Sequence, residues 1–240
     1  MAEQPRVCVV EQATDIPALV RSLGFVTPRP VLVLIGGAGG VSELQVSDLT
    51  GYLRRYVLPA VHRVGAVVVD GGTDSGVMRA IGRMRRDAPT DFPLIGVVAG
   101  GVLEPDPAAA TAGAAVVLEP HHTDLLVVPG EDWGDEVPWL GGIATALAGP
   151  CPSVTLLVNG GEIAYRDMAE SLHHDRPVVV LAGSGRTADD IGAAVDAGDS
   201  ASTMAQQLAG SPLTVVVRYE DGPRLRDVLE FLLGADIITR

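Results

Sequence analysis

The chain has 240 residues, of which 47% are hydrophobic and 4% aromatic, so it can bury an aliphatic core. Its formal net charge of −13 argues against nucleic-acid binding, because contacts to phosphate backbones require clustered lysine and arginine. It has no signal-peptide apolar region and no apolar run near the ~18 residues of a membrane span, so we expect a cytoplasmic protein without membrane insertion.

Aliphatic runs alternate with helix-like stretches through the first half of the chain. The predicted elements are a strand at 6–10, a helix at 15–23, a strand at 31–35, a helical stretch at 44–64, a strand at 66–69, a helix at 75–86 and a strand at 94–99. Asp15 is a plausible N-cap, and Pro59 should bend or interrupt the long helix. The segment 105–113 is predicted as a loop and 115–118 as a short edge strand.

The alternation continues to the C-terminus. The further predicted elements are a strand at 125–128, a helix at 136–147, a strand at 153–158, a helix at 163–173, a strand at 178–181, helices at 188–195 and 203–208, a strand at 213–218 and a helix at 224–232. This order predicts an α/β, Rossmann-like, doubly wound fold with a mainly parallel sheet and helices on both faces. No linker composition divides the chain, so we expect a single domain over residues 1–240.

Three glycine-rich segments directly follow predicted strands, at 36–40, 71–76 and 183–185. Glycine lets the backbone approach a phosphate, and the N–H groups of a following helix point toward an anion. In a parallel sheet the carboxyl ends of the strands lie at one edge, where ligands bind. The segments therefore predict a nucleotide-like ligand, although neither a dinucleotide fingerprint nor a Walker A motif is present.

Two alternatives stay open at the second and third segments. Thr73 is expected to cap the following helix and to offer its hydroxyl to a phosphate, whereas Gly72 and Gly76 would otherwise serve packing alone. Further along, Thr187 has the features of an N-cap, with Asp190 in the reciprocal position of a capping box. The functional alternative has Arg186 pairing with a phosphate or carboxylate, Ser184 donating its hydroxyl and an aspartate binding a ribose.

The scarce tryptophans and the paired histidines also need an interpretation. Trp133 and Trp139 lie near a predicted loop, where they would either stack on a base or anchor the loop against the core. His121 and His122 are adjacent, and neighbouring side chains of a strand face opposite sides, so this pair supplies at most one inward ligand. We expect no metal site.

Four segments carry a family resemblance, and they occur in order within residues 31–195. The segments 71–78, 118–122, 133–136 and 183–189 together resemble the SLOG-type domain at the N-terminus of melastatin-type TRP channels and its prokaryotic relatives, the LSDAT type. The resemblance implies a Rossmann-like ligand sensor, and some channel members use this domain to recognise ADP-ribose-type nucleotides. The predicted ligand-binding residues are Gly36, Gly37, Ala38, Gly39, Gly71, Gly72, Thr73, Gly76, Val77, Met78, Gly183, Ser184, Gly185, Arg186, Thr187 and Asp189.

A weaker similarity reaches the Lonely Guy phosphoribohydrolases, which release a base from a nucleoside monophosphate. It implies an N-glycosidase in which Asp189 or Asp190 polarises the ribose, but both stand where those enzymes carry glutamates, and Arg186 replaces a glycine. A misplacement on the order of 1 Å can cost ~100-fold in rate, so we favour a non-catalytic sensor. We expect a small nucleotide derivative as ligand, no required cofactor, a homo-oligomer and a separate effector protein.

Overall fold

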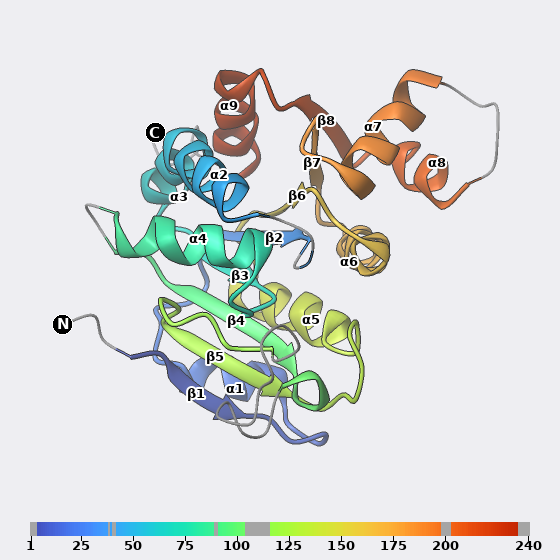
Figure 1. Ribbon diagram of the computed structural model, residues 1–240. Coiled ribbons are helices and arrows are strands. Elements are labelled where there is room, and N and C mark those ends of the chain that lie inside the picture. Colours follow the sequence, from blue (N-terminus) through green and yellow to red (C-terminus); the bar gives the residue numbers. More distant parts are fainter. Residues whose placement is uncertain are drawn as a thin grey trace.

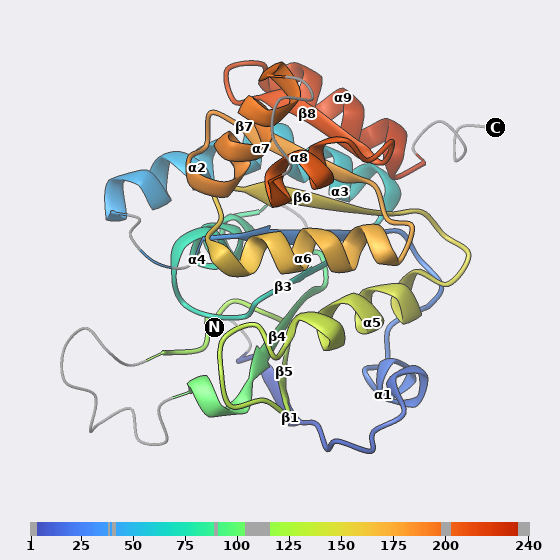
Figure 2. The same ribbon diagram turned by 90° about the vertical axis from the view of Figure 1, so that its right-hand side faces the viewer.

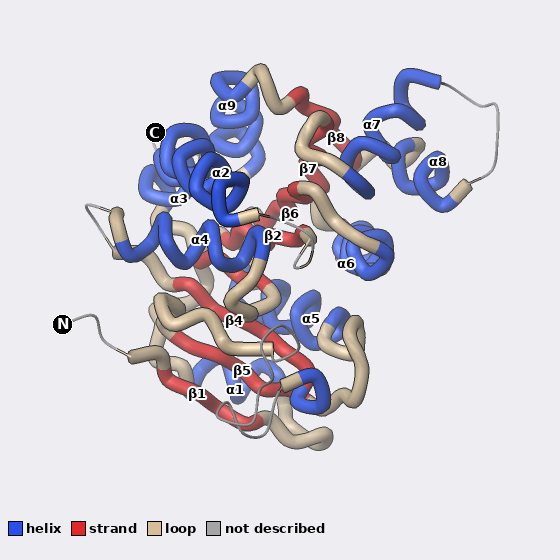
Figure 3. Tube along the Cα trace, viewed as in Figure 1, coloured by secondary structure: helices blue, strands red, loops and turns tan. Residues whose placement is uncertain are grey.

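The structure, a computed structural model, describes residues 4–37, 39, 42–88, 91–103, 116–197 and 203–234. Within these residues, eight strands form one sheet in the order β1-β5-β4-β3-β2-β6-β7-β8, and every neighbouring pair is parallel (Figures 1 and 3). The strands are β1 (Arg6–Val9), β2 (Val31–Gly36), β3 (Val67–Asp70), β4 (Leu94–Ala99), β5 (Asp124–Val128), β6 (Ser153–Val158), β7 (Val178–Ala182) and β8 (Thr214–Arg218). The predicted α/β fold is confirmed, with an all-parallel sheet.

Helices cover both faces of this sheet, as the two perpendicular views show (Figures 1 and 2). One face carries α2 (Glu43–Tyr56), α3 (Leu58–Val64), α4 (Gly76–Arg86) and α9 (Gly222–Leu232). The other carries α1 (Ile16–Ser22), α5 (Val137–Ala148), α6 (Glu162–His173), α7 (Arg186–Ala197) and α8 (Met204–Ala209). A short 3-10 turn, η1 (Gly100–Val102), follows β4. None of the helices in the described parts of the chain has the length and hydropathy needed to cross a bilayer.

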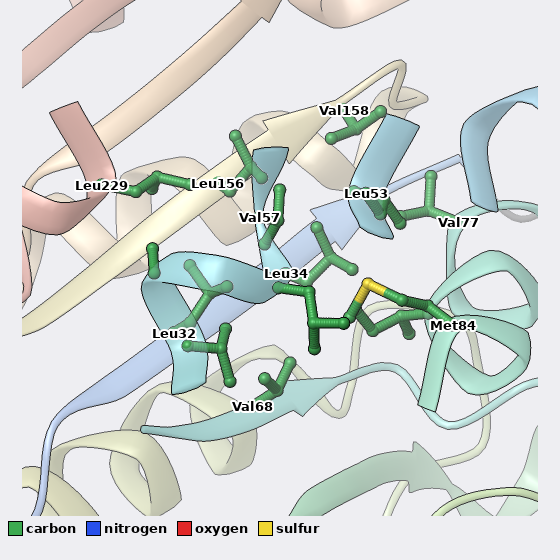
Figure 4. Packing of buried hydrophobic residues seen from close by; sticks show 14 of the residues in the cluster. Leu32, Leu34, Leu53, Val57, Val68, Val77, Met84, Leu156, Val158 and Leu229 are labelled. Atoms are coloured by element: carbon green, nitrogen blue, oxygen red, sulfur yellow. The ribbon is translucent and has the colours of Figure 1, made fainter. Parts of the chain in front are cut away.

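Alternating strand side chains build two separate cores. On β2, Leu32 and Leu34 face α2 and α4, whereas Val33 and Ile35 face α5 and α6. Figure 4 shows the first of these cores, where side chains of the central strands meet those of α2, α4 and α9. Because the central strands are buried on both sides, they read as continuous aliphatic runs, whereas the edge strand β1 is largely exposed.

Two local predictions about helices are confirmed. The Asp15 side chain accepts a hydrogen bond from the backbone N–H of Ala18 and so caps α1. The long helical stretch is divided at Val57 into α2 and α3, and Pro59 lies in the first turn of α3, where its missing N–H costs no helical hydrogen bond.

The predicted edge strand at 115–118 is wrong over the part that the structure describes. Leu118 makes an isolated antiparallel bridge to Thr73, and residues 116–118 form no strand of the sheet. The aliphatic run did not predict this arrangement, because the segment makes its backbone hydrogen bonds to the turn after β3. Residue 115 and the predicted loop at 105–113 lie outside the described residues.

The strand order contains one point where the direction of winding reverses. From β2 the chain proceeds through β3, β4 and β5, and it then returns to β6 on the other side of β2 before continuing to β7 and β8. The connections after β2 and β6 therefore diverge, and they leave a crevice at the carboxyl ends of these two strands. Such a switch point is where open α/β sheets bind ligands.

Candidate functional site

A cavity of about 700 Å³ opens at this switch point. Its volume falls within the ~300–1,000 Å³ that small-molecule sites commonly have. Its walls come from β2 and its loop, the turn after β3, the segment before α5, the first turns of α6 and the start of α7. The lining residues are Leu34, Ile35, Gly36, Gly37, Gly39, Gly71, Met78, Trp133, Glu136, Leu140, Gly161, Glu162, Ile163, Ala164, Asp167 and Arg186.

The first glycine segment forms part of the cavity wall. Gly36 ends β2, and a Cβ there would collide with the backbone oxygen of Val158 on β6 and with the side chain of Val77 on α4. The absence of a side chain therefore lets α4 approach the strand ends closely. Gly37 lines the cavity, and its carbonyl accepts a hydrogen bond from the N–H of Val77 at 3.3 Å. Val77 itself is buried behind the wall and does not line the cavity.

Other residues of this segment are only partly covered by the structure. Gly39 lines the cavity beside Gly37. Ala38, which we predicted as a ligand contact, and Gly40 lie outside the described residues.

The second segment divides between the cavity and the packing behind it. Gly71 lines the cavity, with Met78 from the first turn of α4 beside it. Gly72 does not line the cavity; it has a φ of +68°, and a Cβ there would lie 3.0 Å from the Cα of Gly96 on β4. The left-handed backbone and this close approach both favour glycine, so the packing interpretation describes Gly72.

Thr73 does not cap the helix, contrary to our prediction. Ser75 is the N-cap of α4, without a side-chain capping bond, and Gly76 begins the helix with a φ of +49°. Thr73 is 1% exposed, its hydroxyl pairs with that of Ser75 at 3.1 Å, and its backbone bridges to Leu118. Neither Thr73 nor Gly76 lines the cavity.

The third segment is held by its own polar side chains. The Oδ1 atom of Asp189 accepts hydrogen bonds from the N–H groups of Gly183 at 2.6 Å and Gly185 at 3.1 Å. The Ser184 hydroxyl donates to a carbonyl oxygen of β7 and accepts from the N–H of Asn159 at 2.8 Å. These groups join the loop after β7 to the loop after β6, and none of the four residues 183, 184, 185 and 189 lines the cavity.

The predicted capping box at Thr187 and Asp190 is wrong. Helix α7 begins at Arg186, so Thr187 lies inside its first turn, and the Thr187 hydroxyl donates to the carbonyl of Gly161 at 2.9 Å. Asp190 accepts a hydrogen bond from the Tyr165 hydroxyl at 2.9 Å. The partner of Asp190 lies on α6, and the partner of Thr187 lies in the loop before α6. The spacing of residues within α7 does not predict these contacts.

Arg186 supplies the positive charge of the site. Its guanidinium lines the cavity, approaches the carbonyl of Gly39 at 3.4 Å and lies against the backbone of Gly161. No carboxylate among the described residues forms an ion pair with it. The backbone φ of +49° at this non-glycine residue is unusual and is a form of strain found at functional sites. An exposed, unpaired arginine beside glycine backbone suits an anionic group.

Asn159 is a second strained residue at the switch point. It follows β6 with a φ of +61°, its carbonyl accepts from the N–H of Ala188 at 2.9 Å, and its side-chain Oδ1 is buried without a hydrogen-bond partner in the described structure. We did not predict Asn159 as a site residue.

Two acidic residues that line the cavity, Glu136 and Asp167, were missed by sequence reasoning. Glu136 is 8% exposed, and its Oε2 accepts a hydrogen bond from the N–H of Gly134 at 2.8 Å. Asp167, on α6, lines the cavity without a hydrogen bond to any described residue. No motif links these two carboxylates in the sequence, because they meet only through the packing of α5 beside α6, which Figure 2 shows.

Both acids are shifted toward their protonated forms. Burial raises the pKa of Glu136. Burial and the nearby carboxylate of Glu136 raise the pKa of Asp167 to about 7, against the opposing influence of Arg166. The pair can therefore hold a proton near neutral pH. Perturbed carboxyl groups in a cavity are common at functional sites.

The two tryptophans have different environments. Trp133 lines the cavity and is 41% exposed, so its ring is available to a ligand. Trp139 is partly buried and packs against the core on the α5 face. The core-anchoring interpretation therefore describes Trp139, whereas stacking of a base on Trp133 stays a prediction.

Behind the second glycine segment lies a buried ionic cluster. His122 is within hydrogen-bond distance of Asp70 Oδ1 at 2.8 Å through Nε2 and of Glu119 Oε2 at 2.9 Å through Nδ1. Asp70 Oδ1 also accepts from the N–H of Gly72 at 2.7 Å. Burial disfavours the charged imidazolium, but the two carboxylates outweigh it and raise the pKa of His122 to about 9. The cluster therefore supports the turn that carries Gly71.

The geometric argument that adjacent histidines face opposite sides is wrong here. His121 and His122 lie in a turn before β5, and both contact Glu119, His121 through Nδ1 at 2.6 Å. Strand alternation does not apply within a turn. In the described residues, no group of three or more His, Cys, Asp or Glu side chains is arranged to hold a metal ion.

These features define an α/β domain with a cavity at its topological switch point. The sequence matches the family described as "SLOG in TRPM, prokaryote" over residues 29–226, and the chain belongs to this family. The resemblance found in the sequence is thus confirmed.

A relative outside the prokaryotes is also similar. The chain is 26% identical to "Transient receptor potential cation channel subfamily M member-like 2" of Nematostella vectensis over 262 aligned residues. The match covers 92% of this chain and 16% of the relative. The chain is therefore related to one small part of that much longer protein.

Proposed function

We propose that this chain is a non-catalytic sensor domain that binds a small nucleotide derivative, such as ADP-ribose or a related nucleotide, in the switch-point cavity. The observation that carries the proposal is Arg186, whose guanidinium has no carboxylate partner among the described residues and faces a glycine-lined cavity. A phosphate would receive hydrogen bonds from Arg186 and from backbone N–H groups near the start of α6 and α7. Trp133 offers a ring face on which a base stacks.

The N-glycosidase alternative receives no support from the positions of its expected catalytic groups. Asp189 is bound to the N–H groups of its own loop, and Asp190 is bound to Tyr165. Neither carboxylate lines the cavity. A group that polarises a ribose must reach it within hydrogen-bond distance, so we favour binding over hydrolysis.

Sensing also requires an output, and we propose that ligand binding changes the assembly of a homo-oligomer or its contact with a separate effector. The relative named above is a cation channel subunit, and it contains much more chain than this domain. We place this function in the cytoplasm, where the free thiols of Cys8 and Cys151 stay reduced. Light scattering with and without ligand measures the first of these outputs.

Isothermal titration calorimetry with ADP-ribose, its cyclic isomers and AMP tests the proposal. We expect saturable binding of at least one of these ligands, with base and phosphate both contributing. Lack of binding by all of them at millimolar concentration would contradict the proposal. Release of free base from AMP during the titration would instead favour the hydrolase.

A further inference from the structure

The cavity is lined by Arg186 and by carboxylates, and two of these acids have no role in the function proposed above. Arg186 lies against the glycine backbone of the cavity. Glu136 and Asp167, here called the acidic wall, line the same cavity together with Trp133. A ligand that contacts both Arg186 and the acidic wall needs hydrogen-bond acceptors or negative charge in one part and a hydrogen-bond donor in another.

We propose that Glu136 and Asp167 accept hydrogen bonds from an uncharged donor group of the ligand, an N–H or O–H that lies distal to its phosphate. This inference rests on the proposed function, and it deepens it by fixing the orientation of the ligand and the chemistry of its second end. The donor is either the exocyclic amine of the base or the ribose 2′-hydroxyl.

Asp167 carries the argument, because its carboxyl group is placed at the cavity without a partner. It makes no hydrogen bond or ion pair to any described residue, although Arg166 precedes it on α6. The Arg166 guanidinium instead donates to the carbonyl of Gly134 at 3.0 Å. Asp167 is only partly buried, so its carboxyl oxygens are open to water or to a ligand in the cavity.

Glu136 is fixed in a way that leaves part of its carboxylate available. Only Oε2 is engaged, by the N–H of Gly134, and the residue is buried at the end of the loop that carries Trp133. The N–H of Gly134, the residue after Trp133, therefore fixes one oxygen of this carboxylate. A base stacked on Trp133 would present its edge, and a ribose its hydroxyls, toward this wall.

The charge state of the pair favours a neutral donor over a cation. Burial and the nearby charge of Glu136 raise the pKa of Asp167 to about 7, so Asp167 is partly protonated near neutral pH. A pair in this state offers both an acceptor and a donor, which matches a group such as an amino-substituted ring edge or a diol.

The test is calorimetry of AMP binding to Asp167→Asn and Glu136→Gln, which keep the side-chain size and replace one acceptor oxygen with an NH2 donor. Asp167→Asn is the primary variant, because Glu136 also accepts a backbone hydrogen bond. The matched control is Glu170→Gln, which removes a carboxylate one turn further along α6, outside the cavity wall. We expect each cavity variant to bind AMP about tenfold more weakly or worse, and the control to stay within about twofold of wild type.

Analogues distinguish the two sources of the donor. IMP lacks the exocyclic amine, and 2′-deoxy-AMP lacks one ribose hydroxyl. If the amine is the donor, Asp167→Asn loses affinity for AMP and 2′-deoxy-AMP but not for IMP. If the 2′-hydroxyl is the donor, the variant loses affinity for AMP and IMP but not for 2′-deoxy-AMP. Either pattern supports the inference, since the loss depends on the donor.

Two outcomes would overturn the inference that the acidic wall binds a donor group of the ligand. Folded Asp167→Asn and Glu136→Gln proteins that bind AMP as tightly as wild type would remove the acidic wall from recognition while leaving the proposed function intact. Equal losses for AMP, IMP and 2′-deoxy-AMP would show that the charge acts without contacting either donor. If wild-type protein binds no nucleotide, the proposed function fails as well, and the inference fails with it.

Discussion

The carboxylate of Asp189 accepts hydrogen bonds from the backbone N–H groups of Gly183 and Gly185, so an acidic residue organises the loop that presents Arg186. The contact explains why an aspartate stands close to a site proposed for an anion. Its charge is directed at loop amides, and Arg186 faces the cavity from the first turn of α7.

Replacing Asp189 should therefore impair the site without removing a ligand contact. We expect Asp189→Ala to lower the free energy of unfolding by about 1 kcal/mol, because two backbone donors lose their acceptor at an exposed position. Binding of ADP-ribose should weaken by about tenfold, because Arg186 is less well positioned. Urea unfolding and calorimetry measure the two effects.

Asp190→Ala is the control for this variant. It removes an adjacent carboxylate whose partner is Tyr165 rather than the glycine loop. The affinity of this variant for ADP-ribose should stay within about twofold of wild type. The hydrogen bond that it loses, between Asp190 and Tyr165, is exposed and lies outside the cavity lining. If Asp190→Ala weakens ADP-ribose binding as much as Asp189→Ala does, the hydrogen bonds from Asp189 to the glycine loop do not explain the loss of affinity.

Glycine is required at Gly36 for a reason that stability measurements can isolate. A Cβ at this position would collide with the backbone oxygen of Val158, and backbone cannot move aside as a flexible side chain can. We expect Gly36→Ala to destabilise the fold by about 2–3 kcal/mol, in the range of overpacking mutations.

Gly51→Ala is its matched control, since Gly51 lies inside α2 and a Cβ there meets nothing within 4 Å. This substitution should stabilise the protein by about 0.5–1 kcal/mol, because alanine favours the helix. Opposite signs for the two alanines, measured by denaturant unfolding, are the expected result. Equal effects would mean that the close approach of β2, β6 and α4 is not maintained in solution.

The buried His122 predicts how stability depends on pH. Its folded pKa of about 9 lies above its ordinary value of 6.5, so its charged form stabilises the fold fully below about pH 6.5. This contribution, on the order of 3 kcal/mol, should be lost as the pH rises from 6.5 through about 9. Unfolding free energies measured across this range should therefore fall with increasing pH.

Substitution of His122 tests whether this residue causes the pH dependence of the unfolding free energy. In His122→Gln the fall above pH 6.5 should flatten, and stability at neutral pH should drop by about 3 kcal/mol or more, because Asp70 and Glu119 lose their positive partner. His121→Gln is the comparison, since His121 is partly exposed and contacts only one of these carboxylates. An unchanged slope in His122→Gln would show that other groups cause the pH dependence.

Trp133 should report on ligand binding directly. We expect Trp133→Ala to weaken binding of AMP by about tenfold or more, as stacking on a base commonly contributes ~1–3 kcal/mol, and to leave binding of ribose 5-phosphate unaffected. Binding of AMP should also quench tryptophan fluorescence in Trp139→Phe, which keeps Trp133 as the chain's single tryptophan. Equal losses for AMP and ribose 5-phosphate would argue against stacking.

Much of the fold could be predicted because the signals are local. Buried parallel strands produce uninterrupted aliphatic runs, and Pro59 marks the division between α2 and α3. The positions of Gly37, Gly71 and Arg186 in the cavity follow from the rule that ligands bind at strand carboxyl ends.

The features that could not be predicted depend on contacts between segments that are distant in the sequence. The hydroxyl of Thr187 bonds to Gly161 on another loop, so its N-cap pattern was misleading. Glu136 and Asp167 come from separate elements, and only the packing of α5 against α6 places them in one cavity. Local spacing shows which side chains could contact a ligand, but it does not show which of them the protein uses to hold its own loops.

The central claim, that Arg186 and the glycine loops bind a phosphate at the switch point, is tested most directly by titrating ADP-ribose into Arg186→Ala and Arg224→Ala. Both variants lose one exposed arginine, but Arg224 lies at the start of α9, away from the cavity. We predict a loss of at least about tenfold for Arg186→Ala and wild-type affinity for Arg224→Ala, because a charged hydrogen bond contributes roughly 1.5–3 kcal/mol. Unchanged affinity in a folded Arg186→Ala protein would contradict the account.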